Sequence, residues 1–333
     1  MISDRLLNIK LAPLFFSLFF FSCNNLNDVT MSGFTMGTTY EVKIKDFTYN
    51  KNEFHNSIDS VLVNINKIFS TYIIDSEISH INKSNSLTFS ISKPFKYVLN
   101  KSLFFCSLSK GSYDITVAPL VEQWGFGKNK TQIIPNQKLI SKHLQNIGFE
   151  NIYVRNNKLH KKNKKLTIDL NSIAKGYAVD EIALLIKNRG FNNFLIEIGG
   201  EIKVSSDVSS EPWILGIQNP LSNSVIKRII LKNKSMATSG TYNNYFELDG
   251  NKFSHIINPK TGYPYNYKVV SATVITNDCI DADAFATMAM TLEIDDFLNI
   301  VNKVDGVECY LVEVDNEGKF IYHESINFKT FIE

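Results

Sequence analysis

Residues 167–180, TIDLNSIAKGYAVD, join a stretch of alternating apolar residues to an amphipathic stretch through a polar turn. Asp169 lies near the end of the alternating stretch, and Lys175 lies where apolar residues begin to recur at helical spacing. Polar side chains at a junction between a strand and a helix are typical of ligand sites in α/β proteins. An ordinary helix start with a solvated lysine would give the same pattern, so the chemistry depends on the rest of the chain.

A second pair of polar residues lies towards the C-terminus, in the sequence DADAFAT at 281–287. Asp283 and Thr287 share one face of a predicted helix. Carboxylate and hydroxyl oxygens, with a backbone carbonyl and phosphate oxygens, are ligands that suit Mg²⁺. The chain has neither a Walker-type lysine loop nor a GxGxxG sequence, so a divalent cation is the natural group to neutralise a bound pyrophosphate. Asp281 is the alternative ligand, and a helix cap at Asp283 is the alternative without a metal.

Five further segments carry more polar and glycine residues than packing alone explains. They are 36–40, 70–82, 111–120 with 124–127, 237–240 with 254–264, and 281–287. Taken in order with 167–180, they closely resemble the FAD:protein FMN transferases, the ApbE family of exported flavin transferases. The resemblance extends from Met36 to about Leu292. Each segment is unspecific by itself, and the specificity lies in their number and order.

The resemblance implies roles for individual residues, each at the position that matches the family pattern. The implied cofactor-binding residues are Met36, Tyr72, Ser112, Tyr113, Asp114, Asp169, Lys175, His255 and Ile256. The implied Mg²⁺ ligands are the carbonyl of Ser172, with that of Ala174 as the alternative, and the side chains of Asp283 and Thr287. His255 and Asp283 are the implied catalytic residues. His255 would either accept the proton of the acceptor hydroxyl or contact the cofactor.

The resemblance also implies a reaction. A threonine or serine hydroxyl of an acceptor protein attacks the FMN-side phosphorus of FAD with Mg²⁺ bound, AMP leaves, and FMN stays attached to the acceptor. The implied acceptors are membrane redox subunits and other exported flavoproteins. Two other functions would use the same residues: hydrolysis of FAD to FMN and AMP, and storage or delivery of FAD by a lipoprotein without catalysis.

The N-terminus is predicted to be a targeting segment. Arg5 and Lys10 precede a phenylalanine-rich apolar run at 11–21, which is too short to span a membrane. The run ends at Ser22 and Cys23, which resemble the lipidation site of a bacterial lipoprotein; a plain secretory signal is the alternative. The predicted divisions are a signal peptide at 1–22, a tether at 23–31 and a flavin transferase domain at 32–333. We therefore expect an exported protein, anchored to the membrane through Cys23.

Composition indicates a globular chain without a strong charge. Hydrophobic residues make up 44% of the sequence and the formal net charge is +2, so there is no electrostatic case for nucleic-acid binding. Apart from Cys23, the cysteines are Cys106, Cys279 and Cys309. Their odd number and spacing argue against a disulfide framework and a structural zinc site, and leave open whether any two pair.

Helical and strand patterns alternate along the mature chain, which predicts one α/β (α+β) domain, T-fold-like as the resemblance implies. The predicted helices are 54–69, 94–110, 173–189, 282–292 and 295–303. The predicted strands are 38–45, 152–154, 166–170, 194–198, 213–217, 227–232, 244–248, 268–276 and 308–313. The basic run at 160–165 is expected to be a solvated hairpin turn between 152–154 and 166–170.

Overall fold

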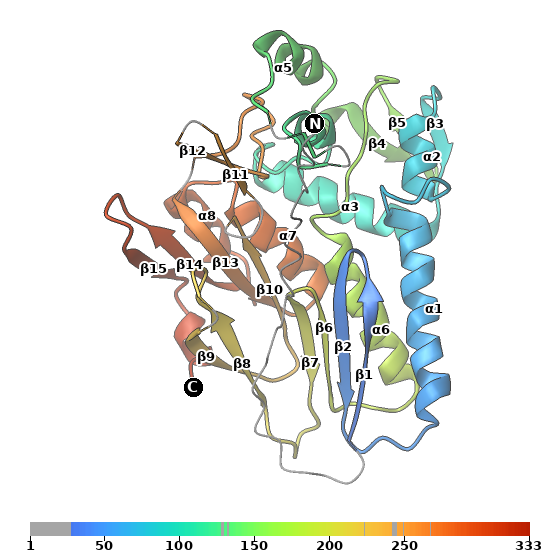
Figure 1. Ribbon diagram of the computed structural model, residues 1–333. Coiled ribbons are helices and arrows are strands. Elements are labelled where there is room, and N and C mark those ends of the chain that lie inside the picture. Colours follow the sequence, from blue (N-terminus) through green and yellow to red (C-terminus); the bar gives the residue numbers. More distant parts are fainter. Residues whose placement is uncertain are drawn as a thin grey trace, which may run out of the picture.

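An eight-stranded sheet forms the centre of the computed structural model (Figure 1). The structure describes residues 28–127, 130–131, 133–222, 224–241, 245–248, 250–266 and 268–333. In spatial order the strands are β1 (Val29–Thr35), β2 (Thr38–Ile44), β6 (Phe194–Ile198), β7 (Glu201–Ser205), β10 (Ser235–Gly240), β13 (Val269–Thr276), β14 (Glu308–Val314) and β15 (Phe320–Glu324). Every described pairing in this sheet is antiparallel, so the predicted mixed fold is of the α+β kind.

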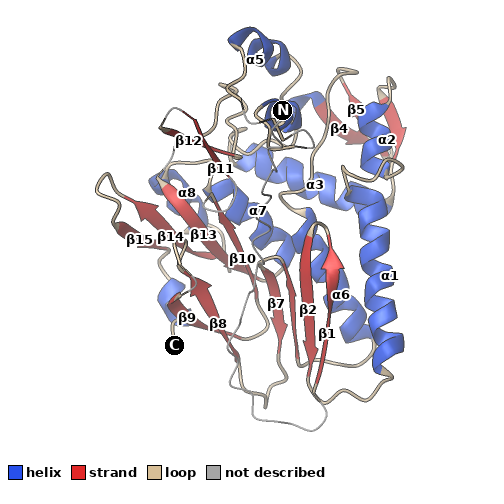
Figure 2. Cartoon of the chain, in the orientation of Figure 1, coloured by secondary structure: helices blue, strands red, loops and turns tan. Residues whose placement is uncertain are grey.

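Three helices pack against this sheet, α1 (Lys51–Phe69) on β1, α6 (Ala174–Asn188) on β6 and β7, and α7 (Cys279–Ala289) on β7, β10 and β13. Figure 2 shows α6 and α7 behind the strands and α1 beside β1. Helix α3 (Lys93–Leu108) and helix α8 (Ile294–Val301) contact α7. A second hydrophobic cluster joins the sheet to the hairpin of β8 (Trp213–Gln218) and β9 (Val225–Leu231) and to the 3₁₀ turn η2 (Phe328–Phe331).

The remaining elements lie in the upper part of the view in Figure 1, above the eight-stranded sheet. They are α2 (Glu77–Lys83), α4 (Ala118–Gln123), α5 (Gln137–Leu144), the 3₁₀ turn η1 (Phe149–Asn151), the small sheet of β3 (Thr88–Ser90), β5 (Lys158–Lys161) and β4 (Ile152–Arg155), and the ribbon of β11 (Tyr245–Leu248) and β12 (Asn251–Ser254). A third cluster, centred on Trp124, packs α4 and α5 against this ribbon.

Amphipathic spacing explains why α1 forms where the sequence predicts a helix. Its buried residues are Phe54, Ile58, Leu62, Ile65 and Phe69. The side chain of Asn50 accepts hydrogen bonds from the backbone amides of Asn52 and Glu53 and so caps the first turn. The predicted helices at 94–110 and 173–189 and the two near the C-terminus are also present, with ends that differ by a few residues.

The strand predicted at 166–170 is wrong. Leu166, Ile168 and Leu170 are buried, as their alternation predicts, but the segment pairs with no described strand. The side-chain amide of Asn82 replaces a neighbouring strand: its Nδ2 donates to the Ile168 carbonyl and its Oδ1 accepts from the Ile168 amide, each at 2.8 Å. The alternating pattern therefore predicts correctly which side chains are buried. The backbone groups of Ile168, however, bond to the Asn82 side chain and not to a neighbouring strand.

The basic run is a solvated turn only in its second half: Lys162, Lys164 and Lys165 are exposed in a turn, but no strand follows at 166–170. The hairpin turns earlier, at Asn156 and Asn157, which both adopt positive φ angles, so that His160 and Lys161 lie in β5. Lys161 is only 2% exposed, and its ammonium donates to the carbonyl oxygens of Ile81 and Leu166. It therefore ties the small sheet to the segment that precedes α6.

The predicted signal peptide, Cys23 and most of the predicted tether lie outside the described residues. No described helix has the length and apolar character needed to cross a membrane. Cys106, Cys279 and Cys309 are all buried and free, which answers the question of pairing for these three.

Candidate active site

Helices α6 and α7 cap each other's N-termini. Oδ2 of Asp283, in α7, accepts a 2.9 Å hydrogen bond from the amide of Gly176 in the first turn of α6. Asp180, in α6, accepts from the first two amides of α7, those of Cys279 at 3.0 Å and Ile280 at 2.9 Å. Neither helix has a side-chain cap from its own N-cap residue. Each helix start therefore receives its side-chain cap from the other helix.

Gly176 allows this close approach. A Cβ atom at this position would lie 2.3 Å from the carbonyl oxygen of Cys279 and 2.8 Å from Cβ of Asp283. Both distances are shorter than van der Waals contact, so a larger residue would push the helices apart. The glycine of the segment at 167–180 is thus explained by helix packing.

Lys203 fixes the pair of helices to the sheet. From β7, its ammonium donates to Oδ1 of Asp180 at 2.7 Å, to the Asn277 carbonyl at 3.2 Å and to Oδ1 of Asp278 at 3.3 Å. The Lys203 side chain is 13% exposed and that of Asp180 19%, so the bond between these two is largely shielded from water, whereas Asp278 is 57% exposed. The start of α7 is therefore fixed to α6 and β7 together.

Lys175, whose side chain is 28% exposed, forms an ion pair with the buried Glu201, the first residue of β7. Its ammonium contacts Oε1 of Glu201, which is 1% exposed. Burial raises the pKa of the Glu201 carboxyl to about 8, against the opposing effect of the Lys175 ammonium. Although burial disfavours its charge, Lys175 has a pKa above the usual value because the carboxyls of Glu201 and Asp283 face it. Oε2 of Glu201 has no hydrogen-bond partner in the described part of the chain.

Asp283 is 2% exposed, and burial raises its pKa, opposed by Lys175 and by the Gly176 amide. Its second oxygen, Oδ1, makes no hydrogen bond with the described residues. Thr287 follows one turn later, with its hydroxyl 3.4 Å from that of Ser239 at the end of β10. A largely buried carboxylate that leaves one oxygen without a hydrogen bond, followed by a hydroxyl one turn later on the same helix, fits a hard cation such as Mg²⁺.

The other predicted metal ligands are less directly placed. Among the described residues no three His, Cys, Asp or Glu side chains gather as a metal cluster, so a cation at Asp283 would need hydroxyl, carbonyl or phosphate oxygens as well. Ser172 lies just before α6, and its hydroxyl is 2.6 Å from that of Tyr113. Asp281, the alternative ligand, is paired with Lys101 at 2.7 and 2.8 Å. This pairing favours Asp283 as the ligand.

The loop after α3 holds three of the predicted cofactor residues. Tyr113 is buried, and the Ser112 carbonyl accepts from the Tyr265 hydroxyl at 3.1 Å. Oδ1 of Asp114 accepts from the amide and hydroxyl of Thr116, and its Oδ2 accepts from the Phe149 amide. Both oxygens of the Asp114 carboxylate therefore form hydrogen bonds that hold the loop itself in place. A ligand at this loop would be bound mainly by backbone groups.

The Asp114 loop also contacts the segment before α6. The Asp169 amide donates to the Ile115 carbonyl at 2.7 Å, and Oδ1 of Asp169 accepts from the Asn171 amide at 2.8 Å. Burial raises the pKa of the Asp169 carboxyl, against these hydrogen bonds from Asn171. With the bond between Tyr113 and Ser172, these contacts bring two of the predicted segments together at the start of α6.

The remaining predicted residues lie on loops and turns. Met36 is at the tip of the β1–β2 hairpin with φ of 49°, and Tyr72 is 65% exposed in the loop after α1. His255 follows β12, with its ring 6.2 Å from that of Phe126. Ile256 is partly buried against the main core. The roles of these four in binding or catalysis stay predictions.

Comparison with known proteins gives one consistent result. The family model described as "ApbE family" matches residues 36–311. The chain belongs to the ApbE family. It is 34% identical to the FAD:protein FMN transferase of Vibrio cholerae over 91% of this chain and 92% of that protein, and 32% identical to the one of Escherichia coli K12 over 97% of both.

Solved structures of the ApbE family agree with the fold. The flavin transferase ApbE from Vibrio cholerae superimposes with a TM-score of 0.84 at 32% identity, covering 92% of this chain and 99% of that one. The apo flavinyl transferase ApbE of Pseudomonas stutzeri gives a TM-score of 0.83 at 28% identity, covering 92% and 96%. The predicted fold class and family resemblance are therefore confirmed.

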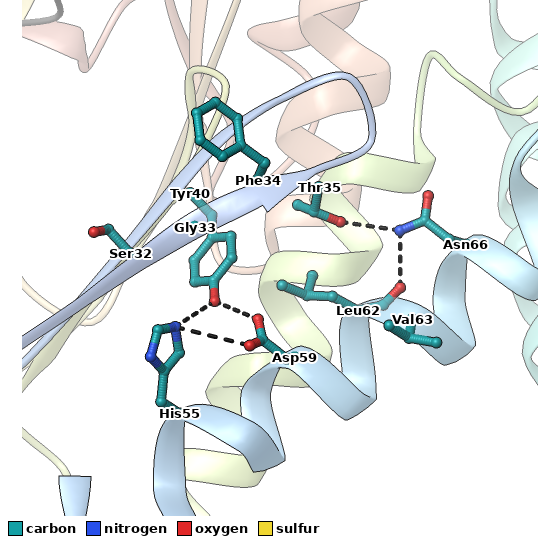
Figure 3. A pocket seen from close by; sticks show the side chains of 10 residues that line it. All are labelled: Ser32, Gly33, Phe34, Thr35, Tyr40, His55, Asp59, Leu62, Val63 and Asn66. Atoms are coloured by element: carbon teal, nitrogen blue, oxygen red, sulfur yellow. Dashed lines mark hydrogen bonds and ion pairs between the residues drawn. The ribbon is translucent and has the colours of Figure 1, made fainter. Parts of the chain in front are cut away.

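A pocket of about 400 Å³ lies between α1 and the hairpin of β1 and β2 (Figure 3). The Tyr40 hydroxyl contacts Nε2 of His55 at 2.7 Å and donates to Oδ1 of Asp59 at 2.5 Å, and Asn66 donates to Thr35. The cavity is lined by Ser32, Gly33, Phe34, Thr35, Tyr40, His55, Asp59, Leu62, Val63 and Asn66. None of these is a predicted site residue, and their hydrogen bonds connect α1 to the sheet edge.

Two parts of the site were not predicted from the sequence. Glu201 interacts with Lys175 and lies outside every segment that carried the family resemblance. Asp180 interacts with the start of α7; it ends the segment at 167–180, but no role was predicted for it. The one usable signal was at 199–201, where a glutamate follows two glycines inside a pattern of buried strands. Thr238, Ser239 and Gly240, which resemble a family loop near phosphates, lie at the end of strand β10 and not in a loop.

Proposed function

We propose that this chain transfers FMN from FAD to a threonine or serine hydroxyl of an acceptor protein. The observation that carries the proposal is the position of the buried Asp283. From α7 it caps the N-terminus of α6 through Oδ2 and leaves Oδ1 without a described hydrogen bond. Lys175 faces its carboxylate, and Thr287 follows one turn later on α7. A helix N-terminus and an ammonium favour phosphate oxygens, and a carboxylate with a hydroxyl favours the cation that accompanies them. A pyrophosphate with Mg²⁺ needs this combination of groups.

In this proposal Asp283, Thr287 and the carbonyl of Ser172 hold Mg²⁺, with the Ala174 carbonyl as the alternative. The cation would supply charge stabilisation at the pyrophosphate. Lys175 and the first turn of α6 act on the phosphates from the protein side. Met36, Tyr72, the loop at 112–114, Asp169 and Ile256 line the flavin site.

The acceptor hydroxyl oxygen forms a bond to the FMN-side phosphorus, and the bond from that phosphorus to the AMP oxygen breaks. The hydroxyl proton passes to an imidazole nitrogen of His255. Positioning and charge stabilisation contribute most of the rate enhancement in such transfers. The products are AMP and an acceptor with FMN in phosphoester linkage.

The test is incubation of the protein with FAD, Mg²⁺ and an exported flavoprotein subunit that has an exposed threonine or serine. Flavin fluorescence that stays with the acceptor in a denaturing gel, with an equal amount of AMP, supports transfer. Free FMN with AMP and no labelled acceptor would indicate the hydrolase, and unchanged FAD would indicate a binding protein. The matched control is the same acceptor with that hydroxyl residue changed to valine or alanine.

We also propose that the protein is exported and anchored through Cys23, with membrane redox subunits among its acceptors. The support is the charged start, the short apolar run and the Ser22–Cys23 pair. Mass spectrometry of the mature protein from its own cells tests this, because a lipidated Cys23 at the N-terminus gives a defined mass increase. A mature protein that starts elsewhere and carries no lipid contradicts the anchor.

A further inference from the structure

Lys175 is placed between two buried carboxylates that belong to different elements. Glu201 extends from β7 and contacts the ammonium directly, while Asp283, on α7, acts on it through its charge without a described hydrogen bond. Both carboxylates are almost fully buried, at 1% and 2% exposure. Both carboxylates therefore attract the Lys175 ammonium, which is bonded to Glu201 and not to Asp283.

The choice of partner matters because Asp283 is the carboxylate proposed to hold the cation. An ammonium paired with Oδ1 of Asp283 would occupy the oxygen that Mg²⁺ needs. Attraction between opposite charges is strong where water is excluded, so a lysine released from Glu201 would turn towards Asp283. Contact with Glu201 prevents this competition.

The backbone around Glu201 is built to hold its side chain in place. Gly199 and Gly200, just before it, have φ angles of 59° and 104°, which allow the turn from β6 into β7. The Gly200 amide donates to Oε1 of Glu197 at 2.8 Å, and a Cβ at Gly199 would lie 2.7 Å from Cγ2 of Thr38. The turn is thus fixed on both sides, and Glu201 begins β7 in one position.

Glu201 is also more buried than a purely structural role would favour. Its Oε2 has no hydrogen-bond partner in the described part of the chain, and a buried carboxyl oxygen in that state is destabilising. Such an arrangement persists where function requires it. We propose that Glu201 is a positioning residue: by binding the Lys175 ammonium it keeps Oδ1 of Asp283 open to a divalent cation. This inference rests on the cation site of the proposed function.

The test measures binding of Mn²⁺, a paramagnetic substitute for Mg²⁺, by electron paramagnetic resonance in the presence of FAD. In Glu201→Leu the half-saturating Mn²⁺ concentration should rise about tenfold or more, as is usual when a partner outside the metal's own ligands is lost. In the double variant Lys175→Met/Glu201→Leu it should return close to the value of Lys175→Met, because the competing ammonium is gone. Glu201→Leu with wild-type Mn²⁺ binding, or a double variant that binds Mn²⁺ clearly more weakly than Lys175→Met, would overturn the proposal.

Two controls separate positioning from folding. Glu201→Gln keeps an oxygen acceptor at the same reach and should recover most of the Mn²⁺ affinity, whereas Glu201→Asp, one methylene shorter, should recover less. If Glu201→Leu fails to fold, the order of these two variants decides the matter, and an equal or reversed order overturns the proposal. Glu313→Leu is the matched control, since it breaks a 2.8 Å pair with His323 in the same sheet far from Lys175.

The outcomes also distinguish this inference from the proposed function. Wild-type protein that shows the expected Mn²⁺ pattern across the variants, but labels no acceptor, contradicts the transfer reaction and leaves the role of Glu201 standing. Wild-type protein that labels its acceptor, while Glu201→Leu binds Mn²⁺ normally, contradicts the role of Glu201 alone.

Discussion

Replacing Asp283 by asparagine and by alanine should separate two roles of one side chain. Oδ2 caps α6 through the Gly176 amide, and Oδ1 is proposed to bind the cation. Asparagine can turn its carbonyl oxygen to Gly176, which leaves its NH₂ group, a donor that repels cations, on the metal side. Alanine loses both roles. We therefore expect both variants to lose transfer and only alanine to lose much stability.

The magnitudes follow from the hydrogen bond. A bond from an amide to a charged group contributes about 1.5–3 kcal/mol, and the Gly176 amide would stay buried without a partner in Asp283→Ala. We expect a loss of roughly 2 kcal/mol, or about 4–8 °C in Tm at about 2–4 °C per kcal/mol. Asp283→Asn should lie within about 1 kcal/mol of wild type, because it keeps an acceptor and removes a buried charge. Loss of a metal ligand should lower transfer in both by at least about a hundredfold, or about 2.7 kcal/mol of activation free energy.

The assay pairs thermal unfolding with acceptor labelling over a Mg²⁺ titration. Asp281→Asn, which breaks the contact with Lys101, is the comparison variant on the same helix. Labelling by Asp283→Asn at the wild-type rate and Mg²⁺ requirement would refute the cation role. A labelling defect in Asp281→Asn alone would transfer that role to Asp281. Equal Tm values for the alanine and asparagine variants would refute the capping argument.

Three more outcomes are expected. His255→Ala should lower the labelling rate at saturating FAD by roughly a hundredfold with little change in FAD affinity, as measured by flavin fluorescence; a parallel fall in affinity and rate would make His255 a cofactor contact instead. Cys23→Ala should give a soluble protein with wild-type labelling in detergent-free extracts, because lipidation affects location only. Gly176→Ala should lower both Tm and Mn²⁺ affinity, since its Cβ would meet the Cys279 carbonyl at 2.3 Å; unchanged values would show that the helices can separate freely.

The sequence predicts the helices better than it predicts the backbone partners of extended segments. The apolar spacing of α1 reports which face is buried, and its cap is local, at Asn50. At 166–170 the alternation reports burial equally well, but the partner is the amide of Asn82, which is far away in sequence. Lys161 is a similar case, because its acceptors are carbonyl groups that only the folded chain brings to it.

The same distinction applies to the site. Asp283, Thr287 and Lys175 were found because each belongs to a compact segment with a family pattern. The structure puts Lys175 and Asp283 at the start of α6 and Thr287 one turn further along α7, beside Ser239. Asp180 and the start of α7, which it caps, are about a hundred residues apart in the sequence. Glu201, which binds Lys175, belongs to a neighbouring strand. No local spacing encodes such contacts, so a single sequence could not reveal them.

The reciprocal caps of α6 and α7 also bear on how this part of the molecule opens. A helix that carries its own cap can fray at one end while its neighbours stay closed. Here, fraying of α7 withdraws the acceptor of the Gly176 amide, and fraying of α6 withdraws the acceptor of the Cys279 and Ile280 amides. Asp283 and Asp180 lie in the second turns of their helices, so unfolding that reaches the second turn of one helix removes the cap of the other and couples the opening of the two.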